Sequence, residues 1–337
     1  MPQISIGDLA QSFMLRRQGT LLKQQMNRLT GELSSGRAAD LNRHLSGSFA
    51  FLADIENDLT VQASYRMAAT EAQFTTAAMQ SALDHVQTLT VDLAETAVTA
   101  GTVSGDAANL GLLAEQGRNI LGSIIGALNT QVAGRAVFAG NAVTSVPLAT
   151  DQDLLTALRG ALAGAVTATD VRATLDAFFD TAGGGFETLI YQGATTALAP
   201  MQLGEGESVA LDLRADNTAI RAVLKETALA ALLDDPALTL TAGEDTLLAT
   251  SLGEGLFSAQ GTVTGIRADL GFAEGRVDYA LARTSAQITS LELARSELVS
   301  VDPFETATEL ENVQLQIETL YTLTARTSRL SLVNFLS

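Results

Sequence analysis

Cysteine and tryptophan are absent from this chain, and only two of its 337 residues are histidine. Without cysteine there can be no disulfide, no thiolate metal site and no cysteine nucleophile. His44 and His85 lie in unlike segments, and neither the HExxH spacing of zinc proteases nor the GxSxG elbow of serine hydrolases occurs. We therefore expect no enzyme activity, with no catalytic, metal-binding or cofactor-binding residues.

Positive charge is also scarce. The chain has 20 lysine and arginine residues against 38 aspartate and glutamate residues, which gives a formal net charge of −18. A surface of this sign repels the phosphates of nucleic acids and the headgroups of anionic lipids. The composition therefore predicts neither a nucleic-acid partner nor a membrane partner.

Long apolar runs are missing as well. No stretch of about 18 apolar residues occurs, so we expect no membrane-spanning helix. The segment MPQISIGDLAQSF at the amino end has neither the basic nor the apolar region of a secretory signal peptide. The sequence thus predicts a protein that is cytosolic, or that leaves the cell without a cleavable signal.

What the chain does contain is aliphatic residues at helical spacing. Leu15, Leu22 and Leu29 are seven residues apart, and Met26 and Leu33 complete alternating steps of four and three, which predicts a helix over 8–33. The segment LSSGR should end it, and a polar loop should follow through Ser46. Similar stripes predict helices over 47–99 and 107–133, and helical heptads again from about 260.

The last helix has a distinct start signal. Asp302 is the expected N-cap, Pro303 takes the first helical position, and Glu305 stands at the third. Leucine, valine and isoleucine then recur from Leu310 onward at helical spacing. We expect this helix to reach the carboxyl end of the chain.

The middle of the chain has another character. After a short hairpin expected at 134–140, residues 141–255 carry three prolines and the run Gly183-Gly184-Gly185. They predict strands at 186–191 and 207–213, a hairpin turn at GEGES (204–208), and helices near 151–164, 169–180 and 216–233, with Asp151 as an N-cap. The fold class predicted is mainly α: a long-helix coiled-coil bundle formed by N- and C-terminal segments, with an inserted α/β domain.

These predicted elements divide the chain into three regions. Residues 1–45 with 300–337 would form a terminal coiled-coil assembly region, residues 46–140 with 256–299 a central helical bundle, and residues 141–255 the inserted outer domain. The terminal helices have complementary charge, because residues 1–45 hold six cations and three acids while residues 301–320 hold five acids and no base. Such complementarity favours their pairing.

The apolar stripes of the terminal helices have two interpretations. They could be the core of one folded chain, or an interface completed by other copies. A hairpin of two helices leaves much of each stripe in water, and each exposed leucine forfeits roughly 1.5–3 kcal/mol of burial. We therefore predict an assembly interface made of Leu15, Leu22, Met26, Leu29, Leu33, Leu310, Val313, Ile317, Leu320, Leu330, Val333 and Leu336.

Three segments carry a resemblance to a known family. LSSGR at 33–37, the stretch from Val301 to Leu332 and the ending SLVNFLS resemble, in this order, elements of the flagellin superfamily. The resemblance covers roughly residues 5–140 and 260–337. GRAVFAGNAVTSVPL at 134–148 is most similar to the hook–filament junction group, hook-associated protein 3. One departure is AADLNRHLSG after LSSGR, where the family has paired acids and this chain has Asp40 alone.

The resemblance implies a structural adaptor that joins the flagellar hook to the filament by self-assembly into a ring. Its partners would be copies of itself, the neighbouring hook-associated protein, flagellin and an export chaperone. The protein would lie outside the cell, exported through the flagellar type III apparatus without a cleavable signal peptide.

Two alternatives remain open at this point. The same fold could serve as the flagellin-type filament subunit. The chain could also be a secreted binding module, with residues 141–255 as an adhesin or carbohydrate-binding domain on a helical stalk, although this segment is poor in the aromatic residues that bind sugars.

Overall fold

The computed structural model describes residues 6–102, 107–241 and 243–336, and the side chains of residues 10–100, 108–241 and 243–327. The chain divides into two compact units. We call residues 1–61 with 286–337 the terminal unit, and residues 62–285 the central unit. Within the described residues, no helix combines the length and the apolar character needed to cross a membrane.

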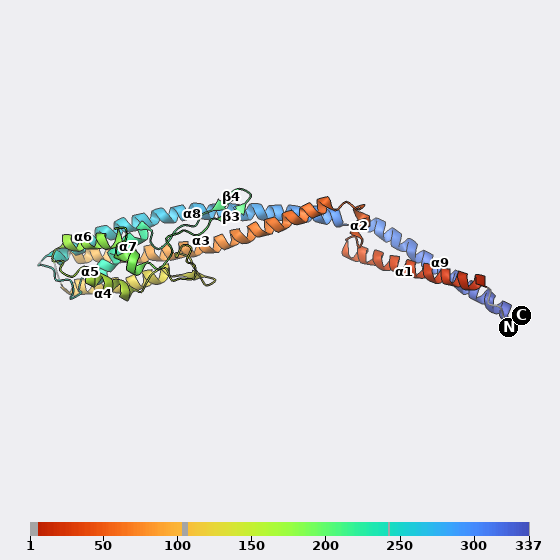
Figure 1. Cartoon of the computed structure of the whole chain (residues 1–337), viewed down its shortest axis with the longest axis horizontal. Coiled ribbons are helices and arrows are strands. Elements are labelled where there is room, and N and C mark those ends of the chain that lie inside the picture. Colours follow the sequence, from red (N-terminus) through yellow and green to blue (C-terminus); the bar gives the residue numbers. More distant parts are fainter. Residues whose placement is uncertain (1–5, 103–106, 242, 337) are drawn as a thin grey trace. The chain divides into compact units, whose positions relative to one another are not determined.

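The terminal unit contains α1 (Ile6–Ser35), the short α2 (Leu41–His44), the start of α3 (Ala50–Thr102), the end of α8 (Glu244–Val299) and α9 (Pro303–Leu336). Helices α1 and α9 lie side by side (Figure 1). The predicted N-cap of α9 is confirmed, because Asp302 Oδ1 accepts hydrogen bonds from the backbone N–H of Phe304 at 2.8 Å and of Glu305 at 3.2 Å. Helix α2 was not predicted and lies in the loop expected through Ser46.

The central unit is built along residues 62–102 of α3 and residues 244–285 of α8, with α4 (Ala107–Leu128), α5 (Asp151–Ala161), α6 (Ala168–Phe179) and α7 (Thr218–Leu232) packed around them (Figure 1). Polar side chains join the two long helices. Gln80 Nε2 donates to the Arg267 carbonyl at 2.9 Å, and Gln87 Nε2 donates to Thr264 Oγ1 at 3.0 Å. The partner on α8 has a lower residue number as the residue number on α3 increases, so the two helices are antiparallel.

Two small antiparallel hairpins complete the central unit. Strands β1 (Gln131–Val132) and β2 (Arg135–Ala136) are joined through Ala133 and Gly134, whose φ angles of 50° and 78° are those of a tight type I′ turn. The hairpin therefore lies a few residues before the predicted 134–140. Strands β3 (Met201–Gly204) and β4 (Glu207–Val209) flank the predicted turn, and β4 is shorter than the strand expected over 207–213.

The strand predicted at 186–191 is wrong. Residues Phe186–Ile190 form the π-helix η1, in which the Tyr191 N–H donates to the Phe186 carbonyl at 2.8 Å. Phe186 and Ile190 are buried and are spaced four apart, which suits a helical turn as well as a strand. Five residues are too few to distinguish the hydrophobic period of a helix from that of a strand, so the sequence could not correct this prediction.

Two helix starts also differ from expectation. Helix α8 begins at Glu244, well before residue 260, because Leu248, Leu252 and Leu256 already form a buried helical stripe. The glycines at 253 and 255 lower the helix propensity of this segment, so the sequence did not predict that the helix starts here. Helix α5 is capped by Thr150, not Asp151: Thr150 and Asp153 make a reciprocal capping box.

The predicted fold class is confirmed: the chain is mainly α, with long helices contributed by both ends and an inserted domain between them. The division into three regions at residues 45, 140 and 255 stays a prediction.

Candidate assembly site in the terminal unit

Apolar side chains of α1 and α9 meet along one line, which we call the α1–α9 seam. Leu22 and Leu29 of α1 are buried against Val313 and Leu320 of α9. Leu15, Met26, Leu310 and Ile317 pack around them and are half-buried. The structure thus brings together eight of the twelve predicted interface residues, and it does so within one chain.

The other four predicted residues are placed differently. Leu33 is exposed and lies outside the seam, because Glu32 takes the buried place in this turn of α1. The side chains of Leu330, Val333 and Leu336 lie outside the described residues. Whether any of the twelve contacts another subunit stays a prediction.

The two helices approach each other closely toward the end of the seam that contains Leu15 and Leu320. A Cβ atom added at Gly19 would lie 3.3 Å from Leu320 Cδ2, which is tighter than most such contacts. Beside this point the Lys23 ammonium lies over the Tyr321 ring, 5.7 Å from its centroid. An ammonium in this position is attracted by the negative face of the ring.

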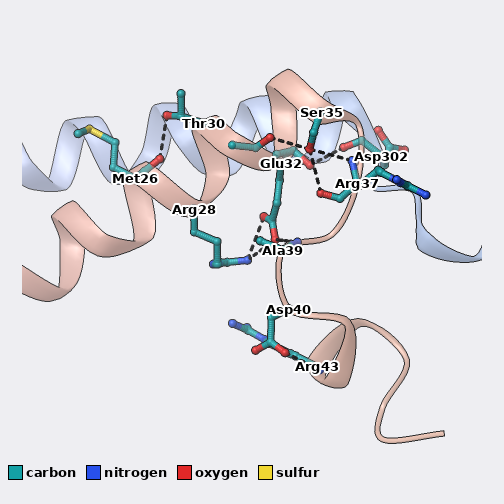
Figure 2. A network of polar contacts seen from close by, with 12 residues as sticks. Met26, Arg28, Thr30, Glu32, Ser35, Arg37, Ala39, Asp40, Arg43 and Asp302 are labelled. Atoms are coloured by element: carbon teal, nitrogen blue, oxygen red, sulfur yellow. Dashed lines mark hydrogen bonds and ion pairs between the residues drawn. The ribbon is translucent and has the colours of Figure 1, made fainter. Parts of the chain in front are cut away.

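We call the paired helices α1 and α9 the terminal hairpin. Glu32 lies near the end of α1, where the loop after this helix begins, and its role was not predicted from sequence. Its side chain is almost fully buried, with the residue 4% exposed. The Arg28 guanidinium donates to both carboxylate oxygens at 3.0 Å, and the backbone N–H of Ala39 donates to Oε1 at 3.0 Å (Figure 2). A buried carboxylate needs such partners, and here they tie the loop after α1 back to the helix.

The LSSGR segment forms the turn that makes this tie possible. Gly36 has a φ of 67°, and its N–H donates to the Glu32 carbonyl at 2.8 Å, which ends α1. The next residues pair with the α8–α9 connection: the Ala38 N–H donates to the Val299 carbonyl at 2.9 Å, and the Val301 N–H donates to the Gly36 carbonyl at 3.1 Å. The LSSGR segment therefore links the end of α1 to the α8–α9 connection.

A polar depression of about 240 Å³ lies next to this turn. Its lining mixes acids and bases, including Asp40, Arg43, His44, Glu305 and Glu309. Among the described residues, no three histidine or acidic side chains are grouped so that they could hold a metal ion.

Large apolar side chains also lie on the outside of the hairpin, and sequence reasoning missed them because it followed the seam. Phe13 is 69% exposed and Leu21 is 56% exposed on α1, while Phe304 is 83% exposed and Leu315 is 63% exposed on α9. Single exposed apolar residues are ordinary, but several on one hairpin indicate an interaction surface.

Most of α8 and the whole of α9 lie within a sequence that matches a known family. Residues 256–336 match the bacterial flagellin C-terminal helical region. This match confirms, for that part of the chain, the flagellin resemblance inferred from sequence. No curated protein matches the chain.

Two solved structures have the same fold as the larger part of the chain. The "putative flagellar hook-associated protein from Vibrio parahaemolyticus" is similar with a TM-score of 0.52 and 12% identity, over 73% of this chain and 95% of that one. Bacillus cereus FlgL is similar with a TM-score of 0.50 and 14% identity, over 72% of this chain and 100% of that one. At these identities the likeness shows the fold alone.

Proposed function

We propose that this protein is a structural adaptor of the bacterial flagellum, which joins hook to filament by assembling into a ring through its terminal helices. The observation that carries the proposal is the terminal hairpin: α9 lies within the flagellin C-terminal match, and the hairpin leaves large apolar side chains in water. A monomer gains nothing from such a surface, whereas a ring of hairpins buries it.

The names of the two matched structures favour the junction role over the role of filament subunit. Both matched structures are named as hook-associated or FlgL proteins, and each is covered almost completely by this chain. The partners would be copies of this chain, a neighbouring hook-associated protein, flagellin and an export chaperone. The protein would act outside the cell and be exported without a cleavable signal peptide.

A deletion strain tests the proposal. Loss of a junction protein should release flagellin into the medium and leave hooks without filaments, and the full chain should restore both. A truncation lacking residues 326–337 should fail to restore them, because it removes the end of α9. The proposal is wrong if the deletion strain keeps its filaments.

The copy number of the protein in the flagellum distinguishes a junction protein from a filament subunit. Sheared flagella analysed by gel electrophoresis should contain this protein as a trace band beside an abundant flagellin. If it is the dominant band, the chain is the filament subunit instead.

A further inference from the structure

The outside of α9 carries a second regular stripe. Phe304, Glu311, Leu315 and Glu318 are all exposed. Together with Thr308 and Thr322 they follow steps of four, three, four, three and four residues. Leu315 comes two residues after the buried Val313, which places it about 200° further round the helix. This outward α9 stripe therefore lies opposite the seam.

Helix α1 has a corresponding outward stripe. Phe13, Arg17 and Leu21 are spaced four apart and are all exposed, as is the neighbouring Met14. Phe13 and Arg17 stand two residues before and after Leu15, so they too point away from the seam, at about 200° from it. We call these four residues the outward α1 stripe.

The two stripes have opposite charge. The α1 stripe carries Arg17, and the α9 stripe carries Glu311 and Glu318. In the part of the chain that the structure describes, none of these three side chains forms a salt bridge, and Arg28–Glu32 is the pair of this unit. Each stripe thus offers apolar side chains together with unpaired charge of one sign.

We propose that the outward α1 stripe of one copy docks on the outward α9 stripe of a second copy. This inference rests on the proposed function and specifies which surfaces meet. The stripes face away from each other across the hairpin, so they cannot pair within one chain. A contact between unlike surfaces leaves a free α1 stripe at one end and a free α9 stripe at the other, and it repeats until a ring closes or a helical array grows.

Charge disfavours the symmetric arrangements. Two α1 stripes placed together would bring Arg17 of one copy toward Arg17 of the other. Two α9 stripes would oppose four carboxylates. Juxtaposed like charges in an interface select against the wrong partner, so the mixed contact is the favoured one.

Cysteine cross-linking tests the contact directly, because the natural chain has no cysteine. Full-length L21C and L315C are prepared separately and oxidised alone and as a mixture, at a concentration where the unmodified chain assembles. The mixture should give a disulfide-linked dimer, and each variant alone should give much less. The docking is wrong if the protein assembles without this cross-link, or if L21C alone cross-links as well as the mixture does.

Reversing the charges on the two stripes provides a second test of the docking. R17E should raise the concentration needed for half-maximal assembly at least about tenfold, and so should E311R/E318R. The triple variant R17E/E311R/E318R has both signs reversed and should assemble again. R16E is the matched control, since Arg16 is exposed on α1 but lies about 100° away from Arg17. Assembly is read by sedimentation velocity.

These outcomes separate the two proposals. Equal loss in R16E and R17E, or no recovery in the triple variant, overturns the docking while self-assembly itself stands. If the unmodified full-length chain stays monomeric at every concentration, both the docking and the proposed ring fail.

Discussion

The terminal and central units bury their helices to very different degrees. In the terminal unit, α1 and α9 share one seam, and side chains on their outer faces remain in water. In the central unit, most of α7 is buried, with Leu224, Leu229 and Leu232 almost inaccessible. The comparison shows that a heptad-like stripe gives a complete core only where further helices cover the remaining faces of the helix.

The central unit reaches this state through several close approaches between elements, of which the described part of the terminal unit shows one, at Gly19. A Cβ atom added at Gly117 of α4 would lie 2.7 Å from the backbone nitrogen of Ala231 on α7, so glycine is required there. The Arg172 guanidinium donates to both oxygens of the buried Glu226 at 2.7 Å and also reaches Ser251. Burial raises the pKa of Glu226, against the opposing effect of Arg172.

The largest expected effect comes from the central core. Phe179 is fully buried, with its ring 5.5 Å from that of Phe186 and 5.3 Å from that of Phe178. Phe179→Ala should lower the free energy of unfolding by about 3–5 kcal/mol, measured by urea unfolding followed by circular dichroism. Phe272→Ala, at an exposed site on α8, is the control and should change it by less than about 0.5 kcal/mol. Equal effects would contradict the burial described for the central unit.

The seam should give the next effect. Leu29 is 2% exposed, so Leu29→Ala should destabilise the α1–α9 hairpin by about 2–4 kcal/mol. Hydrogen exchange should speed up in α1 and α9 and stay unchanged in residues 62–285. Leu21→Ala, on the outer face of the same helix, should leave exchange in the monomer unchanged and weaken assembly. If exchange in the central unit rises as well, the two units are not independent.

Glu32 tests the polar tie at the base of the hairpin. Glu32→Ala leaves the Arg28 guanidinium and the Ala39 N–H without their partner, which should cost about 1–3 kcal/mol. The amide of Ala39 should then exchange faster with solvent. Glu318→Ala removes an equal charge from an exposed site of α9 and should have no such effect. Unchanged exchange at Ala39 in Glu32→Ala would show that the backbone pairing with Val299 and Val301 suffices.

The smallest effect concerns pH. Burial, together with the nearby Asp216 carboxylate, raises the pKa of Tyr191 to about 12, and its hydroxyl donates to the Ala194 carbonyl at 2.8 Å. In the unfolded chain the phenol ionises first, so stability should fall as the pH rises from the ordinary tyrosine pKa toward 12. The loss should be below about 1 kcal/mol, because Tyr191 is only half-buried. Tyr191→Phe should unfold in urea with a weaker alkaline dependence, and an equal dependence would contradict the raised pKa.

Strong local signals were sufficient for the terminal helices. The steps of four and three from Leu15 to Leu29 predicted α1 and its buried face, and Asp302 with Pro303 predicted the start of α9 to the residue. The sequence failed where local signals were short or mixed. Phe186–Ile190 is five residues long, and the glycines of α8 reduced its helical signal although they allow close contacts, as at Gly255 against Glu226.

Glu32 shows a second limit of sequence reasoning. A glutamate beside LSSGR is ordinarily a solvent-exposed residue, and nothing local distinguishes it from Glu311 or Glu318. It is buried because the turn at Gly36 brings the Ala39 N–H onto its carboxylate, which the Arg28 guanidinium of the preceding helical turn also contacts. That arrangement depends on Val299 and Val301, which are far away in the sequence.

By itself, the sequence determined that both ends of the chain are helical, which face of α1 and of α9 is apolar, and that the two ends carry opposite charge. Helix periodicity, capping and charge are local properties of the chain, so they can be read without coordinates. Only the tertiary structure decided which apolar residues are already buried within one chain and which remain on the outward stripes. Burial depends on contacts between residues about 300 positions apart, and no local pattern of residues encodes it.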